Sequence, residues 1–429
     1  MRRFEQPVVP RGARHDGNLK VAAADPLRVL PRHLPQPPRG RTVVVGAGKA
    51  AASMALAVDR HWPSAAPLEG LVITRYRHGL AAGRIRVVEA GHPLPDETGR
   101  KAAREILRLV ERLGPEDLLL GLISGGGSAL LSLPAPGIAM RDLRATTAAL
   151  LRCGAPIQEI NAVRKHLSAI LGGRLAAACR ARALALVISD VTGDEPIHVA
   201  SGPLAPDPAS YADAIEVLDR HRVAAPRAVR AHLERGARGE LSETPKPGDK
   251  AFAQVENRVI AAAHGSLQAA CEFLQRHEVP AVNLGGSVTG EAREVAKVYG
   301  ALVRQIVRYR EPFTPPVALV SGGECTVTVR GRGRGGRASE FLLSLGIDLG
   351  GVPAVHALAC DTDGVDGDGD NAGAILSPDS LARAAALGLN APKMLANNDS
   401  YAFFAALSDL VVTGPTRTNV NDYRAILIA

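Results

Sequence analysis

Three apolar runs in this chain each end in a glycine-rich turn that also carries a charged or hydroxyl side chain. Residues 42–45 lead into Gly46-Ala47-Gly48-Lys49, residues 117–123 into Ser124-Gly125-Gly126-Gly127-Ser128, and residues 316–320 into Ser321-Gly322-Gly323-Glu324. Each run has the composition of a buried strand. A turn made of glycines exposes backbone N–H groups with no side chain in the way, which suits close approach to phosphate oxygens. The pattern therefore predicts strands whose C-terminal ends bind anions.

The composition favours an α/β fold. Hydrophobic residues make up 46% of the chain but aromatic residues only 3%, so the cores must be built mainly from Ala, Val, Leu and Ile. Such residues suit buried parallel strands flanked by helices. Strand-like and helix-like segments alternate from residue 41 onward, which predicts a doubly wound, largely parallel, Rossmann-like sheet with ligands at the C-terminal strand ends. Within this pattern we expect one helix over residues 162–182 and a half-exposed strand over 326–330.

A chain of 429 residues is long for a single hydrophobic core, so two domains are expected. The stretch 235–250 turns polar, and we place the domain boundary there. The predicted organisation is a mobile N-terminal arm over residues 1–20, a Rossmann-like α/β domain over 21–240, and a second α/β domain over 250–429. Ligands would bind in a cleft between the two domains.

The net charge of +8 indicates an anionic partner, unless arginine simply keeps the chain soluble. Nucleic acid is disfavoured because stacking aromatic residues are scarce and no zinc-finger or RNP-type motif is present. The five scattered cysteines form no Cys-x-x-Cys pair, which argues against a disulfide framework or a zinc site. No segment has the pattern of a signal peptide or a membrane span, so we expect a cytoplasmic protein with no membrane partner.

The turn at Gly46 and Gly48 fits the dinucleotide pattern Gly-x-Gly-x-x-Gly/Ala, between a strand and a helix. A reductase is therefore one interpretation. The next strand ends in Thr74-Arg75 and not in an acid, so only the 2′-phosphorylated cofactor, NADPH, would suit. Lys49 favours another interpretation, because an ammonium group in this turn can compensate charge on a transferring phosphoryl group. A tight turn with a solvated lysine is the plain alternative.

The turn 124–128 is the strongest single signal. Three consecutive glycines lose much conformational entropy on folding, so the bare backbone must be needed. A nucleophilic serine elbow would require Gly-x-Ser-x-Gly, which fails because Leu130 stands two residues after Ser128. An anion-binding nest is preferred, with a plain turn as the alternative. Further on, Arg164, Lys165 and His166 are consecutive on a helix and point in different directions, so at most one or two can face a common site. Solvation is the plain expectation for Lys165.

Two acidic loops follow predicted strands. Asp190 and Asp194 follow one strand, and Asp361 and Asp363 follow another. All four are candidates for holding Mg²⁺ or for accepting a hydroxyl proton, and the residues alone do not rank them. The loop 361–370 is not a Ca²⁺-sensor loop, because the required glycine and glutamate are missing. The tract 330–337 resembles the RGG tracts of RNA-binding proteins, but it joins a strand to an apolar helix, which favours a phosphate clamp.

Eight segments together resemble a known family. They are VVVGAGKAA, EAGHPLPDE, LISGGGSALL, NAVRKHLS, ISDVTGDEPIHVASGP, SGGECTVTVRGRGRGGRASE, DTDGVDGDGDNAGA and TGPTRTNVND. In this order they are similar to the class II glycerate kinases, whose C-terminal half is called the MOFRL domain. The resemblance runs from about residue 21 to the last residue.

The resemblance implies ATP-dependent phosphorylation of D-glycerate at its 2-hydroxyl, giving 2-phosphoglycerate and ADP, with Mg²⁺ as the metal. The family's essential lysine falls on Lys49 and its essential arginine on Arg337. Many relatives are expected to have Asn and Gln after that arginine, where this chain has Ala338 and Ser339, although Glu340 is retained. Older naming of the family as hydroxypyruvate reductases echoes the dinucleotide-like turn.

The predicted site combines both lines of argument. Lys49 and Arg337, from separate halves of the chain, would converge on the transferred phosphoryl group, with Asp190 as the third catalytic residue. Metal binding is assigned to Asp194, Asp361 and Asp363. Substrate or nucleotide phosphate binding is assigned to Gly46, Gly48, Ser124, Gly125, Gly126, Gly127, Ser128, Arg164, Glu324, Glu340 and Asn419. The alternatives are an NADPH-dependent hydroxypyruvate reductase and a non-enzymatic anion-binding module. The oligomeric state stays open, with a homodimer as one option.

Overall fold

The computed structural model describes residues 22–429, so the predicted N-terminal arm lies outside the described residues. This part of the chain folds into two compact units. The N-terminal unit comprises Ala22–Ser266 and Arg417–Asn421, and the C-terminal unit comprises Leu267–Thr416 and Asp422–Ala429. The predicted boundary at 235–250 is therefore too early. The reason is that β6 (Val255–Ala261) pairs with β5 (Arg182–Ile188) and completes the first sheet.

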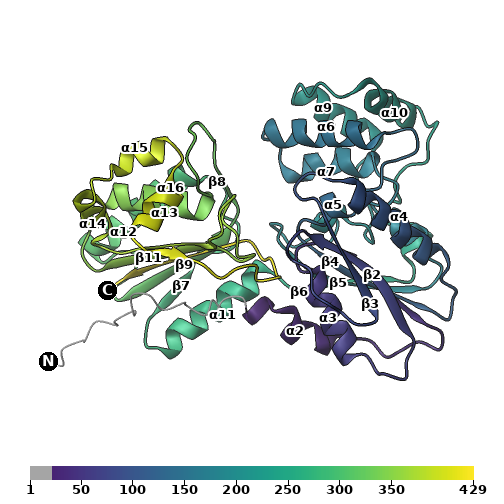
Figure 1. Cartoon of the computed structure of the whole chain (residues 1–429), viewed down its shortest axis with the longest axis horizontal. Helices are drawn as coiled ribbons and strands as arrows, with labels where there is room; N and C mark the ends of the chain where they lie inside the picture. The colour runs from purple at the N-terminus through teal and green to yellow at the C-terminus, as the bar shows by residue number, and fades with distance from the viewer. Residues whose placement is uncertain (1–21) are drawn as a thin grey trace. The chain divides into compact units, whose positions relative to one another are not determined.

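The sheet of the N-terminal unit has six parallel strands (Figure 1). The strand order is β3-β2-β1-β4-β5-β6, which is the doubly wound order of dinucleotide-binding folds. The remaining strands are β1 (Thr42–Ala47), β2 (Leu68–Arg75), β3 (Ile85–Ala90) and β4 (Leu118–Ser124). Every residue of β1 and β4 is buried, as apolar runs covered on both faces should be. The direction of winding reverses between these two strands, so their C-terminal ends mark the expected ligand site.

Helices cover both faces of this sheet, and a separate helical layer is added to it (Figure 1). α3 (Ala51–His61) packs through Met54 on one face, and α4 (Glu97–Glu111) through Ile106 on the other. The added layer has its own core, which includes Leu150, Val163 and Leu233. Its helices are α6 (Met140–Arg152), α7 (Ile157–His166), α9 (Tyr211–Arg220) and α10 (Arg227–Ala237). The unit also contains α2 (Pro26–Val29), α5 (Gly127–Leu130) and α8 (Arg174–Ala177).

The long helix predicted over 162–182 is wrong. α7 ends at His166, and the chain turns before the short helix α8. Ser168 stabilises this turn, because its Oγ accepts hydrogen bonds from the N–H groups of Ile170 and Leu171. Gly172 and Gly173 then take φ values of +60° and +79°, a left-handed backbone that a helix cannot continue through.

The C-terminal unit contains a six-stranded mixed sheet in the order β13-β12-β11-β14-β9-β7. Among its described strands only β7 and β9 pair in parallel; the other neighbours are antiparallel. The strands are β7 (Ala281–Asn283), β9 (Val317–Gly323), β11 (Val355–Asp361), β12 (Gly373–Leu376), β13 (Leu410–Val411) and β14 (Asp422–Ile428). A short parallel pair joins β8 (Gly290–Glu291) and β10 (Cys325–Thr326). The predicted α/β class is confirmed for both units.

The strand predicted over 326–330 is shorter than expected. β10 stops at Thr326, and the Thr328 N–H then donates to the Glu291 side chain at 2.9 Å, so a carboxylate replaces a partner strand. The unit's core surrounds Phe341 of α13 (Arg337–Leu349), which packs against α12 (Ala292–Tyr309). The other helices are α11 (Ala263–Arg276), which belongs to this unit from Leu267 onward, α14 (Ser380–Ala386), α15 (Ala391–Ala396) and α16 (Ser400–Ala406). Across the described residues, no helix combines the length and the apolar character needed to span a bilayer.

Candidate active site

The turns after β1 and β4 are bonded to each other at the point where the sheet reverses its winding. The Lys49 N–H donates to the Gly125 carbonyl at 2.8 Å, and the Ala50 N–H donates to the Ser124 Oγ at 3.1 Å. Gly48 must be a glycine, because its φ is +141° and a Cβ there would lie 2.1 Å from that hydroxyl oxygen. Two turns that are far apart in the sequence thus form one structural feature, as their shared position at strand ends predicts.

The second turn presents unused backbone donors. Gly126 has a φ of +80° and is followed by the short helix α5. The N–H groups of Gly126, Gly127 and Ser128 have no hydrogen-bond partner among the described residues. Consecutive N–H groups in a left-handed then right-handed turn form an anion-binding nest. The Lys49 side chain lies beside this turn, since its Cγ is 3.4 Å from where a Cβ of Gly126 would stand.

Asp190 and Asn419 lie over the same turn. A Cβ on Gly125 would be 1.8 Å from the Asp190 Oδ2 and 2.7 Å from the Asn419 Nδ2. The Asn419 amide donates to that carboxylate oxygen at 2.7 Å. Asn419 is there because residues 417–421 return to the N-terminal unit, held by the Ser53 hydroxyl on the Arg417 carbonyl at 2.6 Å. The structure therefore brings together Lys49, the turn 124–128, Asp190 and Asn419.

Two further residues of this unit bear on the predicted site: Asp194, which the sequence selected, and His92, which it did not. Asp194 has a left-handed backbone (φ +55°), and among the described residues its side chain makes no hydrogen bond or ion pair. His92, which sequence reasoning did not select, approaches the second turn: its Nε2 is 2.9 Å from where a Cβ of Gly126 would stand. The only signal for it was its place in the segment EAGHPLPDE.

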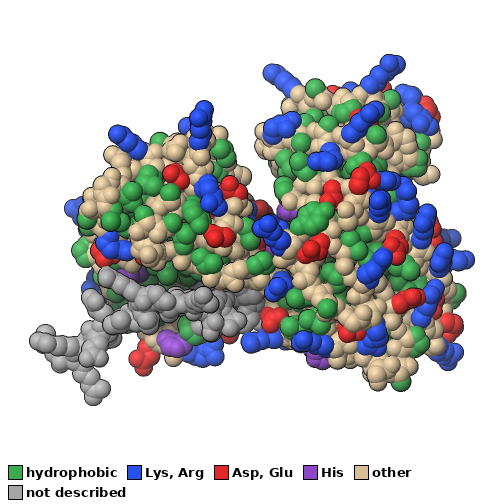
Figure 2. All heavy atoms as spheres, in the orientation of Figure 1, with side chains coloured by type: hydrophobic (Ala, Val, Ile, Leu, Met, Phe, Trp, Pro, Cys, Tyr) green, Lys and Arg blue, Asp and Glu red, His purple; other side chains and the backbone are tan. Residues whose placement is uncertain are grey.

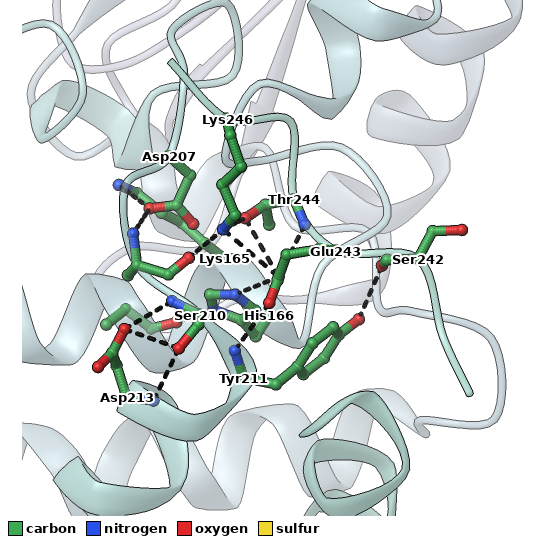
Figure 3. Close-up of polar contacts among 12 residues, drawn as sticks. Lys165, His166, Asp207, Ser210, Tyr211, Asp213, Ser242, Glu243, Thr244 and Lys246 are labelled. Carbon is green, nitrogen blue, oxygen red and sulfur yellow. Dashed lines mark hydrogen bonds and ion pairs between the residues drawn. The ribbon is translucent and has the colours of Figure 1, made fainter. Parts of the chain in front are cut away.

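The three consecutive basic residues at the end of α7 diverge as predicted, but Lys165 is not solvated. Its ammonium group is buried and lies 3.2 Å from the Asp207 carboxylate. The His166 Nε2 lies 2.8 Å from the Glu243 Oε1 (Figure 3). The side chain of Arg164, which is partly buried, makes no hydrogen bond or ion pair with any described residue. Burial lowers the pKa of Arg164 to about 10, so the guanidinium group is still protonated at neutral pH.

In the C-terminal unit, Arg337 is the first residue of α13 and is surrounded by carboxylates. Its Nε donates to Asp422 at 2.7 Å, one terminal nitrogen to Glu324 at 2.7 Å, and the other to Asp361 at 2.8 Å. Burial alone would lower the pKa of Arg337, but the three carboxylates raise it well above the usual value. Sequence reasoning missed Asp422, which is fully buried and also binds Arg424 at 2.7 Å.

Carboxylates of the acidic loop 361–370 accept hydrogen bonds from the loop's own backbone and from the start of α13. The Asp363 N–H donates to Asp361 at 3.0 Å, and Asp363 accepts from the Val365 N–H at 2.8 Å. Asp366 caps the start of α13 by accepting hydrogen bonds from the N–H groups of Ala338 and Ser339 at 3.0 and 2.9 Å. The first turn of the helix, and with it Arg337, is thereby held in place.

Glu340 does not lie at an accessible surface as its predicted substrate contact would require. It is 1% exposed; one carboxylate oxygen accepts from Arg293 and the other from the Asn398 amide, each at 2.9 Å. Its role in the structure is to connect α12, α13 and the loop before α16. A buried acid on an apolar helix looks the same in sequence as a binding residue, so local pattern could not separate the two.

The arginine–glycine tract before α13 is an ordered loop. The N–H groups of Arg330 and Gly331 donate to the Asn398 side chain at 2.8 and 3.0 Å, and the Gly333 N–H donates to the Asn397 carbonyl at 2.9 Å. A Cβ on Gly331 would be 2.3 Å from that carbonyl oxygen. The alternate arginines 330, 332 and 334 are exposed. Figure 2 shows basic side chains distributed over both units and interspersed with acidic ones.

A metal site is not preformed by side chains alone. Within residues 22–429, no group of three or more His, Cys, Asp or Glu side chains is arranged to hold a metal ion. Asp194 belongs to the N-terminal unit, whereas Asp361 and Asp363 belong to the C-terminal unit. Mg²⁺ commonly binds through one or two carboxylates together with substrate phosphates, and these oxygen donors suit it.

Comparisons with known proteins agree with this architecture. A domain of unknown function, DUF4147, matches residues 17–234, and the MOFRL family matches residues 317–422. A glycerate 2-kinase of Pyrococcus horikoshii is 40% identical over 89% of this chain and 86% of its own length. A protein of Agrobacterium vitis, named without firm assignment as a hydroxypyruvate reductase, is 48% identical over 95% of this chain and 92% of its own. The crystal structure of Thermotoga maritima glycerate kinase superposes with a TM-score of 0.83 at 36% identity, covering 96% of this chain and 97% of that one.

Proposed function

The chain belongs to the class II glycerate kinase family, and we propose that it transfers the γ-phosphoryl group of ATP to the 2-hydroxyl of D-glycerate, giving 2-phosphoglycerate and ADP. Phosphoryl transfer depends on positioning and on neutralising charge that is spread over the phosphoryl oxygens. The chain offers what that requires: an ammonium group on Lys49, the backbone N–H groups after Gly125, and the Asp190 carboxylate.

One observation carries the choice between kinase and reductase. In a dinucleotide-binding fold the pyrophosphate accepts hydrogen bonds from N–H groups at the start of the helix after the first strand. Here the two N–H groups that directly precede α3, on Lys49 and Ala50, already donate to the turn 124–128. That second turn lies where the pyrophosphate would bind. This arrangement supports a phosphate site on the turn 124–128, beside Lys49. It disfavours a dinucleotide site on the turn at Gly46 and Gly48.

Each candidate residue then receives a role. Lys49 compensates charge on the transferring phosphoryl group, and the nest at Gly126, Gly127 and Ser128 binds anionic oxygens. Asp190 accepts the proton of the attacking hydroxyl group, oriented by the hydrogen bond from Asn419. In the C-terminal unit, Arg337 is the cation that we propose for binding a phosphate group.

We further propose that Asp361 and Asp363 in the C-terminal unit, and separately Asp194 in the N-terminal unit, are the carboxylates available to hold Mg²⁺ together with nucleotide phosphates. The metal would supply charge neutralisation at the β- and γ-phosphates. Glu324 is the exposed one of the three carboxylates on Arg337, with 54% of its side chain accessible, so it is the one that a phosphate group can displace. A cytoplasmic location and a homodimer remain predictions.

The test is steady-state kinetics with Lys49→Ala. We expect turnover with D-glycerate and ATP to fall by roughly a hundredfold or more, because a charge aimed at the transition state is lost. Circular dichroism should be unchanged, because a partly exposed turn lysine contributes little to stability. Lys101→Ala, an exposed lysine on α4, is the matched control and should keep full activity.

Phosphorus NMR of the product distinguishes 2-phosphoglycerate from 3-phosphoglycerate. Full activity of Lys49→Ala would refute the role given to this lysine. Oxidation of NADPH by hydroxypyruvate in the absence of ATP would instead establish the reductase. The non-enzymatic module is set aside, because the family to which the chain belongs is one of kinases.

A further inference from the structure

Arg164 lines a pocket that offers it no acidic partner. The pocket lies within the N-terminal unit and is also lined by the hydroxyl residues Ser128, Ser132 and Thr147 together with Leu133 and Leu143. None of its lining residues is acidic. Burial removes the water that would otherwise solvate the guanidinium group, and the surrounding apolar and hydroxyl groups do not neutralise its charge. Binding an anion in this pocket would therefore be favourable.

The two residues that follow Arg164 fix its direction. Lys165 is tied to Asp207 at 3.2 Å, with side-chain exposures of 3% and 0%. His166 is tied to Glu243 at 2.8 Å, and Glu243 also accepts from the N–H groups of Thr244 and Tyr211 (Figure 3). These pairs hold the last turn of α7 against the loops around Asp207 and Glu243. Since consecutive helical residues point in different directions, Arg164 is left facing the pocket.

A chain of hydrogen bonds connects the pocket to the same helix. The Ser128 Oγ lies 2.7 Å from the Ser201 Oγ, and Ser201 donates to Asn161 of α7 at 2.9 Å. Ala200 and Ser201 both have positive φ values, +51° and +56°. Backbone strain of this kind persists only where the surroundings impose it, and it is common at binding sites. Ser128 also belongs to the nest beside Lys49. Its hydroxyl group is therefore connected through Ser201 and Asn161 to the helix that carries Arg164.

We propose that this pocket binds the carboxylate of the D-glycerate substrate, with Arg164 as its cation and the Ser128 hydroxyl beside it. The pairs Lys165–Asp207 and His166–Glu243 act as positioning residues. The inference rests on the proposed function, since it names the part of the substrate that this pocket holds.

A carboxylate fits better than a nucleotide phosphate, the other small oxyanion available to a kinase. The pocket offers one cation, which matches one carboxylate in a bidentate pair. A triphosphate carries several negative charges and would leave most of them uncompensated by this single group. The leucine side chains in the lining also suit a short carbon skeleton and not a phosphate chain.

The experiment compares Arg164→Gln and Arg164→Lys with the wild-type protein. Loss of a charged hydrogen-bonded partner should raise KM for D-glycerate roughly 10- to 100-fold in the glutamine variant. The lysine variant should recover part of this loss. KM for ATP should change less than about twofold, the size of coupling expected between sites that share no contacts. Arg152→Gln, an exposed arginine on α6, is the matched control and should leave both constants unchanged.

Calorimetric titration of D-glycerate into the protein without nucleotide gives a readout independent of turnover. Binding should be present in the wild type and lost in Arg164→Gln, while titration with glycerol, which lacks the carboxylate, should not distinguish the two proteins. A rise in KM for ATP alone would overturn the proposal and assign the pocket to a nucleotide phosphate. Unchanged glycerate binding in Arg164→Gln would overturn it as well. A wild-type protein that binds D-glycerate through Arg164 but does not phosphorylate it would refute the kinase and support the pocket.

The positioning role has its own test in the double variant Lys165→Met/Asp207→Leu, which replaces the buried pair by apolar groups of similar size. KM for D-glycerate should rise severalfold, with KM for ATP and the melting temperature close to the wild-type values. A variant with unchanged KM for D-glycerate would limit Lys165 and Asp207 to a structural role and overturn that part of the proposal.

Discussion

Replacing Lys165 by methionine measures how much stability the N-terminal unit loses when the cation of the buried Lys165–Asp207 pair is removed. This pair holds the last turn of α7, which carries Arg164. The Asp207 side chain is fully buried, and its Oδ2 has no hydrogen-bond partner within the described part of the chain. Its Oδ1 would keep only the Ala209 N–H at 3.1 Å. Burial lowers the pKa of Lys165 even though Asp207 raises it, so desolvation already opposes the charged pair. Removing only the cation leaves an uncompensated buried carboxylate.

Breaking a buried pair by removing one partner typically destabilises a protein by about 3 to 5 kcal/mol. For a folding unit of this size, each kcal/mol shifts the melting temperature by roughly 2 to 4 °C. Lys165→Met should therefore lower the melting transition of the N-terminal unit by about 6 to 20 °C, as measured by calorimetry on the full chain.

The matched control is Lys297→Met on α12. Lys297 also pairs with a carboxylate, Glu294, at 2.9 Å, but the two side chains are 55% and 59% exposed. Solvent screening limits such a pair to about 1 kcal/mol or less, so this variant should melt within about 4 °C of the wild type. Equal small shifts in Lys165→Met and Lys297→Met would refute the reasoning, because burial would then have no energetic consequence.

Two further predictions concern the loops that support the sites. Gly333→Ala should destabilise the C-terminal unit by about 1 to 3 kcal/mol, because a Cβ there would lie 2.4 Å from the Asp399 Cβ; Gly265→Ala, with nothing within 4 Å, is the control, and thermal unfolding of both variants is the measurement. For Glu243, burial raises the pKa but hydrogen bonds from His166 and backbone N–H groups lower it to about 2. Its contribution to stability is thus complete above the unfolded-state pKa, near 4.3, and is lost as the pH falls toward 2. The difference in urea midpoint between wild type and Glu243→Gln should therefore become smaller as the pH falls from about 4.5 to about 3. A difference that stays constant over this range would contradict the lowered pKa of Glu243.

The α/β class and the family membership followed from the sequence because both depend on local patterns. An apolar run that ends in glycines has few alternatives to a buried strand with a tight turn. Topology then brings the turns after β1 and β4 to the same edge of the sheet, which is why Lys49 and Ser124 could be placed together in advance. The roles of these residues stay predictions.

Features that depend on contacts between distant segments were not accessible in the same way. β6 lies beyond the polar stretch that we took for a domain boundary, and only its pairing with β5 assigns it to the first sheet. The helix predicted over 162–182 failed because Gly172 and Gly173 adopt left-handed conformations that local apolar periodicity does not reveal.

Periodicity along the chain reports which face of an element is apolar, and glycines report where the backbone must turn or approach closely. Apolar periodicity and glycine positions alone predicted the strands and the glycine turns, and they singled out Lys49 as a candidate site residue. The partner of a charged side chain is set by whichever segment packs against it, often from far along the chain. For that reason only the tertiary structure decided that Lys165 and Glu340 are buried, that Asp422 holds Arg337, and that Arg164 has no ionic partner among residues 22–429.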